Sequence, residues 1–475
     1  MQIVVIAAFV TALSLLEAPL EVTDARWAAP AVLAYLLVAL VLAAGNTALS
    51  LRAVAQTGET SSRVLRRHNR VAILGRFWLV GGLAGTLLMG MADAVHQAGL
   101  MGVPLAAELA VLAPFAAALV LTWIMEYPFH LAVRRRIAWR EALQGRFPRP
   151  VWSLRGYLTF NIRHHLLFVA VPVGLILLLS DILDLYVAPH LGEAAMSVRF
   201  AGSLLAAGLV FLLAPLMLVR IWQTARLTDG PLRDKLESLC RRLKLRARDI
   251  RVWLTGGVVA NAGVMGLVAP VRYVLLSDAL LEEMDDEQVQ AVFAHEAGHI
   301  VHHHIFYAVL FAVGSIVLCT SATDLLLRLA GLDPAGAPQL WSLVVVAIVW
   351  AFGFGWISRR FERQSDVLAA WLVGRSLHDS DADGDVDRIM PEGAAVFARS
   401  LEKIAILNGI PLTQRNWRHG SIAHRVEYVL RLGSTGRTRR EADRAVERIK
   451  LGIWLLLLTS TVLAVIDFSQ TTAAR

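Results

Sequence analysis

The sequence predicts a mostly helical protein that crosses a membrane several times and carries a small α+β domain outside the bilayer. Mean hydropathy is +0.57, hydrophobic residues make up 56% of the chain and charged residues only 18%. These values lie well outside the range of soluble globular proteins. Two more hydrophilic stretches, residues 223–304 and 358–450, interrupt the apolar runs and supply the smaller domain.

The apolar runs are long enough to be membrane-spanning helices. The first run has no basic leading segment and no small-residue cleavage site, so we expect an uncleaved anchor and not a signal peptide. The predicted spans cover residues 2–20, 28–50, 77–94, 103–125, 166–186, 199–221, 305–327, 339–357 and 451–468.

Arginines predict on which side of the membrane each loop lies. The loops after the second and fourth spans are rich in arginine, whereas the alternate loops hold only Arg26. The positive-inside rule therefore places the arginine-rich loops, and with them residues 222–304 and 358–450, in the cytoplasm. Arginines far outnumber lysines, which suggests a GC-rich bacterial source. We therefore expect a multi-pass protein of a bacterial inner membrane.

These assignments divide the chain into five regions. They are an N-terminal membrane domain of about six spans, the first part of the hydrophilic domain, a membrane hairpin of two spans, the second part of the hydrophilic domain, and a last span with its tail. In that order the regions are residues 1–222, 223–304, 305–357, 358–450 and 451–475.

The net charge of +8 does not indicate a nucleic-acid partner. The arginines flank the spans, where they determine topology and contact anionic lipid headgroups. The chain has no basic module interleaved with aromatic residues. We therefore expect the lipid bilayer, and no nucleic acid, among its partners; the oligomeric state does not follow from the sequence.

Residues 295–299 read His-Glu-Ala-Gly-His, the most informative stretch of the chain. Asp285, with Gln288 three residues later, predicts a helix start, and the apolar residues that follow have helical spacing. On this helix His295 and His299 lie one turn apart on the same face, where both can bind one zinc ion. Glu296 lies beside them as a base for a zinc-bound water.

A catalytic zinc site needs a third protein ligand. His302 shares the helical face but lies about 10 Å along the axis from His295, and the metzincin position is occupied by Ile305. Glu362 is the better candidate, since Glu362 and Asp366 are four residues apart on a second helix. We assign Glu362 to the metal and expect Asp366 to accept the free ring N–H of a zinc-binding histidine.

Two further clusters have a structural and a functional interpretation. Residues 302–304, three consecutive histidines, could form a second metal or proton site, but polar caps on the next span are favoured. Residues 379–387 match part of an EF-hand loop, with Met390 in place of the bidentate glutamate. A solvated acidic loop is favoured over calcium there. The calcium ligands would be Asp379, Asp381, Asp383 and Asp387.

In these motifs the chain resembles the membrane zinc metallopeptidases that include the heat-shock protease HtpX and the type 1 CAAX prenyl proteases. That family carries an upstream Asn-Ala segment, His-Glu-x-x-His, Glu-x-x-x-Asp and a downstream His-Pro-x-x-x-x-Arg-type motif. Here the same order is Asn261-Ala262, residues 295–299, residues 362–366 and residues 419–425. The resemblance covers roughly residues 235–435, and the spans of the N-terminal membrane domain are additional to it.

The resemblance implies a zincin-like peptidase domain and several residue roles. Asn261, Ala262 and Gly263 would form a strand edge that pairs with an extended substrate. His419 and Arg425 would donate hydrogen bonds to the oxyanion, although a surface loop residue and a salt-bridge partner are the structural alternatives. Gly420 replaces the usual proline, which predicts a less constrained loop around His419, and Ser365 replaces an alanine.

We therefore expect a zinc metalloendopeptidase with one zinc per chain, acting on protein or peptide substrates at the cytoplasmic face. Quality control of membrane proteins is the role that analogy with HtpX suggests. A protease for prenylated peptides is the alternative within the enzyme class. A non-catalytic membrane scaffold or transporter that keeps a metal site is the alternative outside it, but such a protein has no use for Glu296.

Overall fold

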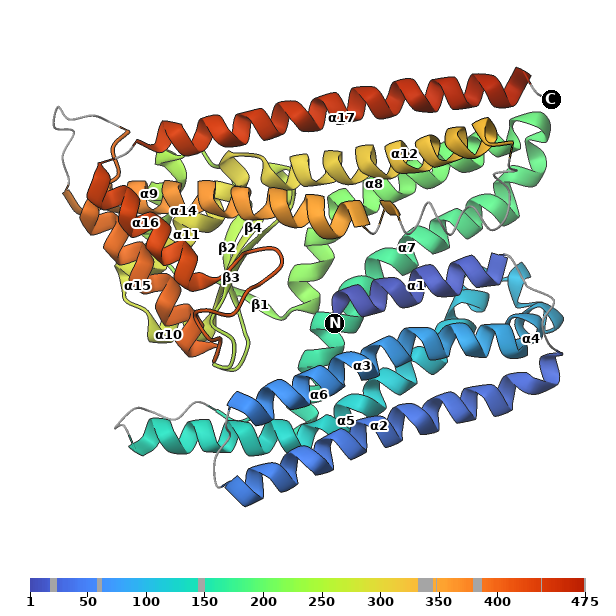
Figure 1. Cartoon of the computed structure of the whole chain (residues 1–475), viewed down its shortest axis with the longest axis horizontal. Coiled ribbons are helices and arrows are strands. Elements are labelled where there is room, and N and C mark those ends of the chain that lie inside the picture. Colours follow the sequence, from blue (N-terminus) through green and yellow to red (C-terminus); the bar gives the residue numbers. More distant parts are fainter. Residues whose placement is uncertain are drawn as a thin grey trace. The chain divides into compact units, whose positions relative to one another are not determined.

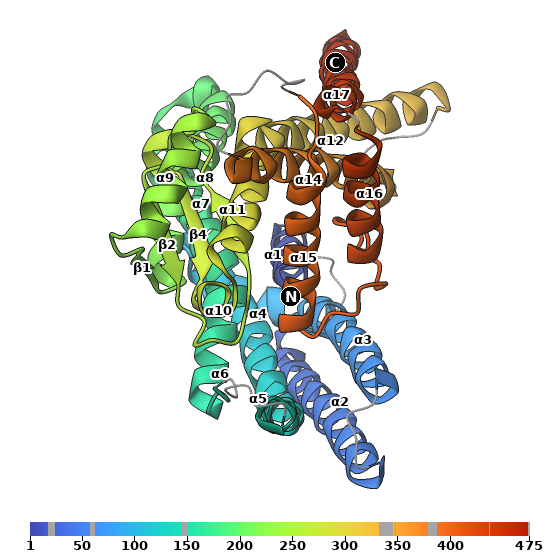
Figure 2. The ribbon, with the colours of Figure 1, turned by 90° about the vertical axis from the view of Figure 1, so that its left-hand side faces the viewer.

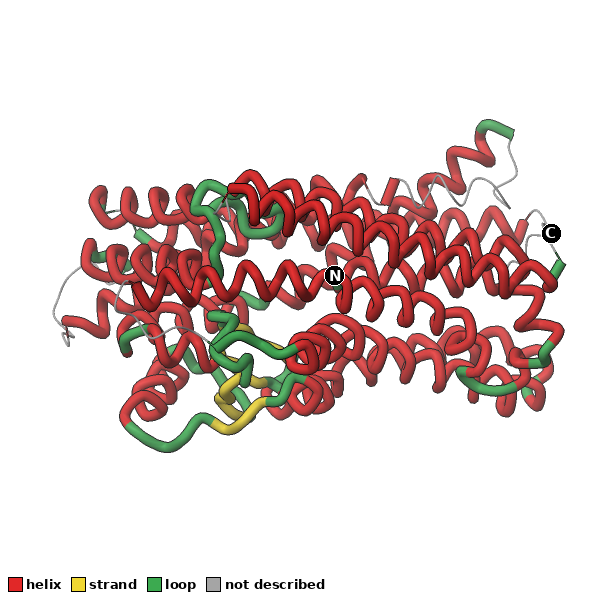
Figure 3. The backbone as a smooth tube through the Cα atoms, turned by 90° about the horizontal axis from the view of Figure 1, so that it is seen from below, coloured by secondary structure: helices red, strands yellow, loops and turns green. Residues whose placement is uncertain are grey.

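Helices make up most of the molecule, and four short strands form one small sheet in the described part of the chain (Figures 1 and 3). The chain divides into two compact units, Met1–Gln223 and Thr224–Arg475. This architecture confirms the predicted fold class. The computed structural model describes residues 1–17, 24–57, 62–143, 150–331, 345–346, 348–378, 387–436 and 438–473.

The first unit is a bundle of apolar helices. Helix α2 packs against α3 and α5, and α1 packs against α3. Tyr35 is buried in this bundle, where its hydroxyl donates a 2.9 Å hydrogen bond to the Leu79 carbonyl and so satisfies a polar group in an apolar interior. The helices are α1 (Gln2–Glu17), α2 (Ala28–Thr57), α3 (Ser62–Thr86), α4 (Ala92–Gln97), α5 (Ala106–Leu143), α6 (Leu154–Asn161), α7 (Phe168–Ile182) and α8 (Ala195–Ile221).

Within the described residues, seven helical segments are long and apolar enough to cross a membrane, fewer than the nine spans predicted. The run predicted at 2–20 is helical over Gln2–Glu17, and its last three residues lie outside the described part of the chain. The span predicted at 339–357 lies partly outside the described residues. The seven segments are Ala25–Gln56, Arg63–Gln97, Ala106–Trp139, Leu154–His190, Ala195–Ile221, His304–Leu329 and Arg439–Ile466.

The sheet lies in the second unit and has the order β1-β2-β4-β3. Strand β2 pairs in parallel with β4, and the two outer strands pair antiparallel to their neighbours. The strand β3 (Ala262–Met265) is therefore at the edge of the sheet, within the segment predicted to bind substrate. The other strands are β1 (Thr224–Arg226), β2 (Asp249–Trp253) and β4 (Tyr273–Ser277).

Eight α-helices of the second unit have bounds within the described residues. Helix α11 packs against α14 and α15, and α14 packs against α15 (Figure 2). The long helices α12 and α17 lie side by side (Figure 1). The helices are α9 (Pro231–Arg242), α10 (Asp278–Glu283), α11 (Asp286–Val301), α12 (His304–Leu329), α14 (Gly355–His378), α15 (Pro391–Leu407), α16 (Ile422–Thr435) and α17 (Arg439–Ala473).

Candidate metal centre

The helix that carries the His-Glu-Ala-Gly-His stretch begins where the sequence predicts. Asp285 adopts an extended conformation and its side chain accepts a 2.8 Å hydrogen bond from the Gln288 N–H, which satisfies one of the free donors at a helix start. Residues Val289 to Ala294 are buried in the core of the second unit. The cap and this burial fix α11, so the histidines are presented on a rigid element.

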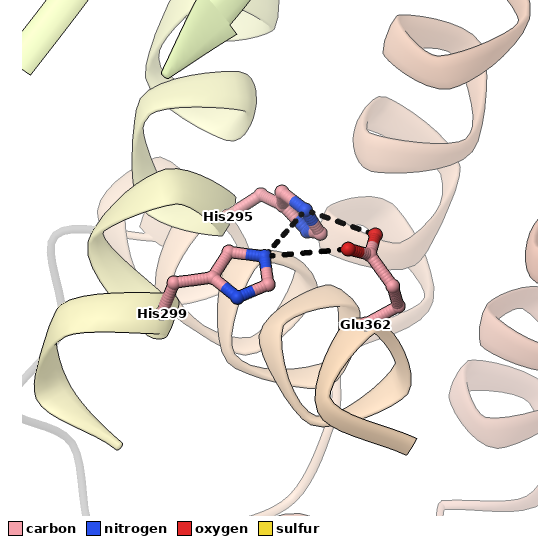
Figure 4. Close-up of side chains that lie close together, drawn as sticks. All are labelled: His295, His299 and Glu362. Carbon is pink, nitrogen blue, oxygen red and sulfur yellow. Dashed lines mark hydrogen bonds and ion pairs between the residues drawn. The ribbon is translucent and has the colours of Figure 1, made fainter. Parts of the chain in front are cut away.

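His295, His299 and Glu362 meet in one cluster, with a ligand atom of each lying within 4.8 Å of the other two (Figure 4). The two histidine Nε2 atoms are 3.3 Å apart. The Glu362 carboxylate lies 3.5 Å from His295 Nε2 and 3.6 Å from His299 Nε2. In Figure 4 both rings, from α11, point toward the carboxylate from α14.

These distances fit one tetrahedral zinc ion. Nitrogen and oxygen ligands bind zinc at about 2.0–2.2 Å, so ligand atoms of one tetrahedral ion lie about 3.3–3.6 Å apart. The spacing of the three ligand atoms matches this range, and two imidazoles with one carboxylate leave a fourth position free for water. His302 is not part of the cluster, and its Nε2 lies 4.0 Å from an oxygen of Asp443 instead.

Small residues let α11 and α14 approach closely enough for this cluster to form. A Cβ atom placed on Gly298 would lie 3.0 Å from the Cα of Ser365 on α14. Both positions are therefore restricted in size, because a larger residue would push the two helices apart. Ser365, the departure from the family pattern, is fully buried at this contact.

A buried carboxylate and arginine support the His295 side of the cluster. His295 Nδ1 lies 3.0 Å from an oxygen of Asp366, as the sequence predicts for a residue that orients a metal ligand. Arg425 donates two hydrogen bonds to Asp366, and its third nitrogen lies 3.1 Å from Glu362 Oε2. Burial alone would raise the pKa of Glu362, but Arg425 and the neighbouring histidines hold that pKa well below its ordinary value.

The loop that carries His419 is closed by backbone and side-chain hydrogen bonds. Asn416 and Gly420 exchange two backbone hydrogen bonds of 2.9 Å, and the Asn416 side chain accepts from the Arg418 and His419 N–H groups. Gly420 has φ +78°, which proline cannot adopt. The expected loss of constraint is therefore wrong, because glycine is the residue that this turn requires. His419 Nδ1 lies 2.7 Å from Glu362 Oε1.

A cavity of about 510 Å³ opens onto the cluster. Glu296, His419, Arg425 and the start of the edge strand, Asn261 and Ala262, line it, and Gly263 follows in β3. Burial is the main cause that raises the pKa of Glu296, with His295 opposing it. The cavity therefore brings the proposed base, the metal ligands and the free edge of the sheet into one place.

Two contacts of the site do not follow from the spacing of residues in the sequence. Asn408 donates to the Ala260 carbonyl at 2.7 Å and accepts from the Ala260 N–H at 3.2 Å, which fixes the segment leading into β3. His304 is buried at the start of α12, and its Nδ1 lies 3.0 Å from His299 Nδ1, a contact that the sequence does not predict. Asn408 and Ala260 lie far apart in the sequence, and His299 and His304 lie on either side of a helix break. No spacing rule applies to either pair.

The predicted calcium loop lies mostly outside the described residues. Among its candidate ligands only Asp387 is described, and its carboxylate pairs with Arg439 and Arg440. The calcium hypothesis for the remaining residues, Asp379, Asp381 and Asp383, is not tested by the structure.

Comparison with known proteins identifies the segment that contains most of this site. The sequence model of Peptidase family M48 matches residues 226–386. A protein of Arabidopsis thaliana described as "CAAX prenyl protease 1 homolog" is 30% identical over 162 residues, which cover 31% of this chain and 38% of that relative.

A solved structure, described as "Crystal Structure of S. mikatae Ste24p", is also similar. It has a TM-score of 0.48 and 17% sequence identity, over 85% of this chain and 98% of that one. The M48 segment contains all three residues of the metal cluster, whereas His419 and Arg425 lie after its end. The match to the M48 model and the spacing of the ligand atoms are both consistent with a metal site formed by His295, His299 and Glu362.

Proposed function

We propose that this chain is a membrane-embedded zinc metalloendopeptidase that hydrolyses peptide bonds of protein substrates at the cytoplasmic face of a bacterial inner membrane. The observation that carries the proposal is the shared cavity. Glu296, the three metal ligands and the edge of β3 line the same space. A scaffold or transporter that only retained a metal would need neither the base nor the edge.

Each residue has a chemical task in this proposal. A zinc ion held by His295, His299 and Glu362 supplies a Lewis acid that polarises the scissile carbonyl and makes a water more acidic. Glu296 takes the proton from the attacking water and returns it to the leaving amine. Its raised pKa suits the first step, because a carboxylate with a higher pKa is a stronger base toward water, and the carboxylic acid formed can still donate its proton to the more basic amine.

The free edge of β3 would hold the substrate in an extended conformation. Hydrogen bonds along a strand edge bind peptide backbone without regard to sequence, and adjacent pockets select side chains. Val264, Phe397 and Ile404 give one wall of the cavity an apolar character. We therefore expect substrates with an apolar side chain close to the cleaved bond.

His419 and Arg425 differ in how freely they could stabilise the oxyanion. The His419 side chain is 44% exposed and lines the cavity. The Arg425 side chain is 10% exposed, and its guanidinium contacts two carboxylates. We therefore assign the oxyanion donor to His419 first, while the same role for Arg425 stays a prediction.

The test is hydrolysis of casein by the detergent-purified full chain and by its Glu296→Gln variant, each stripped with a chelator and supplied again with zinc. We expect zinc-dependent hydrolysis by the wild-type protein and a loss of about 10²–10⁴-fold in the variant, with one zinc retained in both. A prenylated peptide assayed in parallel tests the narrower activity that the name of the Arabidopsis relative suggests.

Inactivity of the wild-type protein on casein, membrane proteins and prenylated peptides, while it binds one zinc, would contradict the proposal. It would favour the non-catalytic membrane protein instead. Equal hydrolysis by wild type and Glu296→Gln would contradict the assignment of the base.

A further inference from the structure

A chain of hydrogen bonds leads from the metal ligand His299 to helix α17. His299 Nδ1 lies 3.0 Å from His304 Nδ1. His304 Nε2 lies 2.9 Å from the side-chain oxygen of Gln364, and the Gln364 amide nitrogen donates to Asp443 at 2.7 Å. His304 is 3% exposed and Gln364 is 1% exposed, so the middle of this chain is shielded from water.

A break between α11 and α12 creates the first of these contacts. In one continuous helix, residues five apart point about 140° away from each other, because each residue turns the helix by about 100°. Here α11 ends at Val301, and His303 adopts a left-handed conformation with φ +57° before α12 begins at His304. The turn brings the His304 ring back onto His299.

The position of each proton follows from the metal end of the chain. A histidine that binds zinc through Nε2 is neutral and carries its proton on Nδ1. His299 Nδ1 is therefore the donor, and His304 Nδ1 must accept. Neutral His304 then carries its proton on Nε2, which faces the oxygen of Gln364. Every bond from His299 to Asp443 has one donor and one acceptor, so the chain is fully satisfied.

Packing holds His304 in this orientation. Its ring stacks on Phe361 of α14 with a centroid distance of 4.2 Å and an interplanar angle of 3°. Both of its ring nitrogens are occupied, one by His299 and one by Gln364. The His304 ring therefore contacts Nδ1 of His299, the ring nitrogen that faces away from the metal position. His304 is not itself one of the metal ligands.

We propose that His304 is a positioning residue for the metal centre: it accepts the Nδ1–H of His299 and, with Gln364 and Asp443, fixes the tautomer and orientation of that ligand. The inference rests on the proposed zinc site and adds to it a support from α12, α14 and α17. Loss of such an outer partner typically weakens metal binding by about 10–100-fold.

The experiment is a zinc-affinity measurement by competition with a chromophoric chelator, on the detergent-purified full chain. His304→Phe keeps a ring that can stack on Phe361 but removes the acceptor, and we expect its zinc affinity to fall by about 10–100-fold. His304→Asn keeps an acceptor near the position of Nδ1, and we expect it to regain most of that loss. His303→Asn changes the exposed histidine of the same helix break, asparagine tolerates its left-handed conformation, and we expect wild-type affinity.

Cobalt(II) substitution provides a second readout that does not depend on catalysis. The visible absorption bands of bound cobalt report ligand geometry, and we expect them to shift in His304→Phe but not in His303→Asn. If His304→Phe fails to fold, Gln364→Met removes the next bond of the chain and should lower zinc affinity by a smaller factor.

Wild-type zinc affinity and an unchanged cobalt spectrum in His304→Phe would overturn the proposal. An equal loss of affinity in His303→Asn would also overturn it, because the effect would then be general disruption of the helix break. If the wild-type chain bound no zinc, the proposed function itself would fail. A wild-type protein that bound zinc but hydrolysed nothing would leave the His304 test intact.

Discussion

His295 and His299 lie one turn apart on α11, but their outer ring nitrogens meet partners of opposite character. His295 faces the carboxylate of Asp366, which Arg425 neutralises. His299 faces a neutral histidine, which a glutamine supports in turn. The ion and Arg425 together would carry as much positive charge as Glu296, Glu362 and Asp366 carry negative charge. A second carboxylate in place of His304 would disturb that balance in a buried site.

The two supports share α14, which supplies Glu362 to the metal, Asp366 to one support and Gln364 to the other. Asp366 on His295 and His304 on His299 show that a metal ligand can be oriented by a charged or by a neutral partner. The charged support requires a counter-ion and the neutral one requires a complete chain of hydrogen bonds. Variants of the two supports should therefore differ in their effects on stability, zinc affinity and proton release.

Replacing Arg425 should have the largest effect on stability. Arg425→Gln leaves Asp366 and Glu362 buried without their cation, and breaking such a buried pair costs about 3–5 kcal/mol. We expect the free energy of unfolding of the metal-free protein to fall by that amount. Thermal unfolding in detergent would measure it, and a loss below about 1 kcal/mol would show that the cation is not needed.

Replacing Asp366 should act mainly on the metal. Asp366→Asn keeps the shape but removes the charge that favours a proton on His295 Nδ1, and we expect zinc affinity to fall by about 10–100-fold. Chelator competition on Asp366→Asn and His304→Phe compares the two supports directly. The double variant tests their independence, since separate supports give losses whose free energies add. A double variant no worse than either single one would show that the supports act as one.

Zinc binding should depend on pH through His295. In the metal-free site burial lowers the pKa of His295, but Asp366 and Glu362 outweigh it and raise that pKa from 6.5 to about 9. The protonated ring stabilises the metal-free fold fully below pH 6.5, and this contribution is lost as the pH rises through about 9. A zinc ligand must be deprotonated, so affinity should rise about tenfold per pH unit between pH 7 and 9.

Calorimetry in buffers of different ionisation enthalpy would count the proton released at pH 7.5. Asp366→Asn should reduce the release, because it removes one of the two carboxylates that raise the pKa of His295. His304→Phe should leave it unchanged, because it leaves both carboxylates in place. Equal release in wild type and Asp366→Asn would contradict the assignment of the charged support.

A change at the contact between α11 and α14 should have the smallest effect on the free energy of unfolding, and it should affect both supports. Gly298→Ala places a Cβ atom 3.0 Å from the Cα of Ser365, which costs about 1–3 kcal/mol in overpacking and gains about 1 kcal/mol in helix propensity. We expect a net loss of about 1 kcal/mol in unfolding free energy. Ser365→Gly should relieve part of it, and no relief would mean that the helices adjust elsewhere.

The sequence predicts those parts of the site that local spacing determines. His295 and His299 are four apart on a capped helix, and Glu362 and Asp366 are four apart on another, so each pair shares a helical face. His304 follows a helix break that spacing rules do not anticipate; Gln364 contacts it from α14, and Asp443 contacts Gln364 from α17. The run predicted as a span at 2–20 is helical over Gln2–Glu17, the part of it that the structure describes.

The most direct test of the metal centre is X-ray absorption at the zinc edge on the full chain loaded with one equivalent of zinc. We predict two imidazole nitrogens and carboxylate or water oxygen at about 2.0–2.2 Å from the ion, and loss of this pattern in Glu362→Gln. A shell of oxygen atoms without imidazole, or an unchanged spectrum in Glu362→Gln, would contradict a site formed by His295, His299 and Glu362.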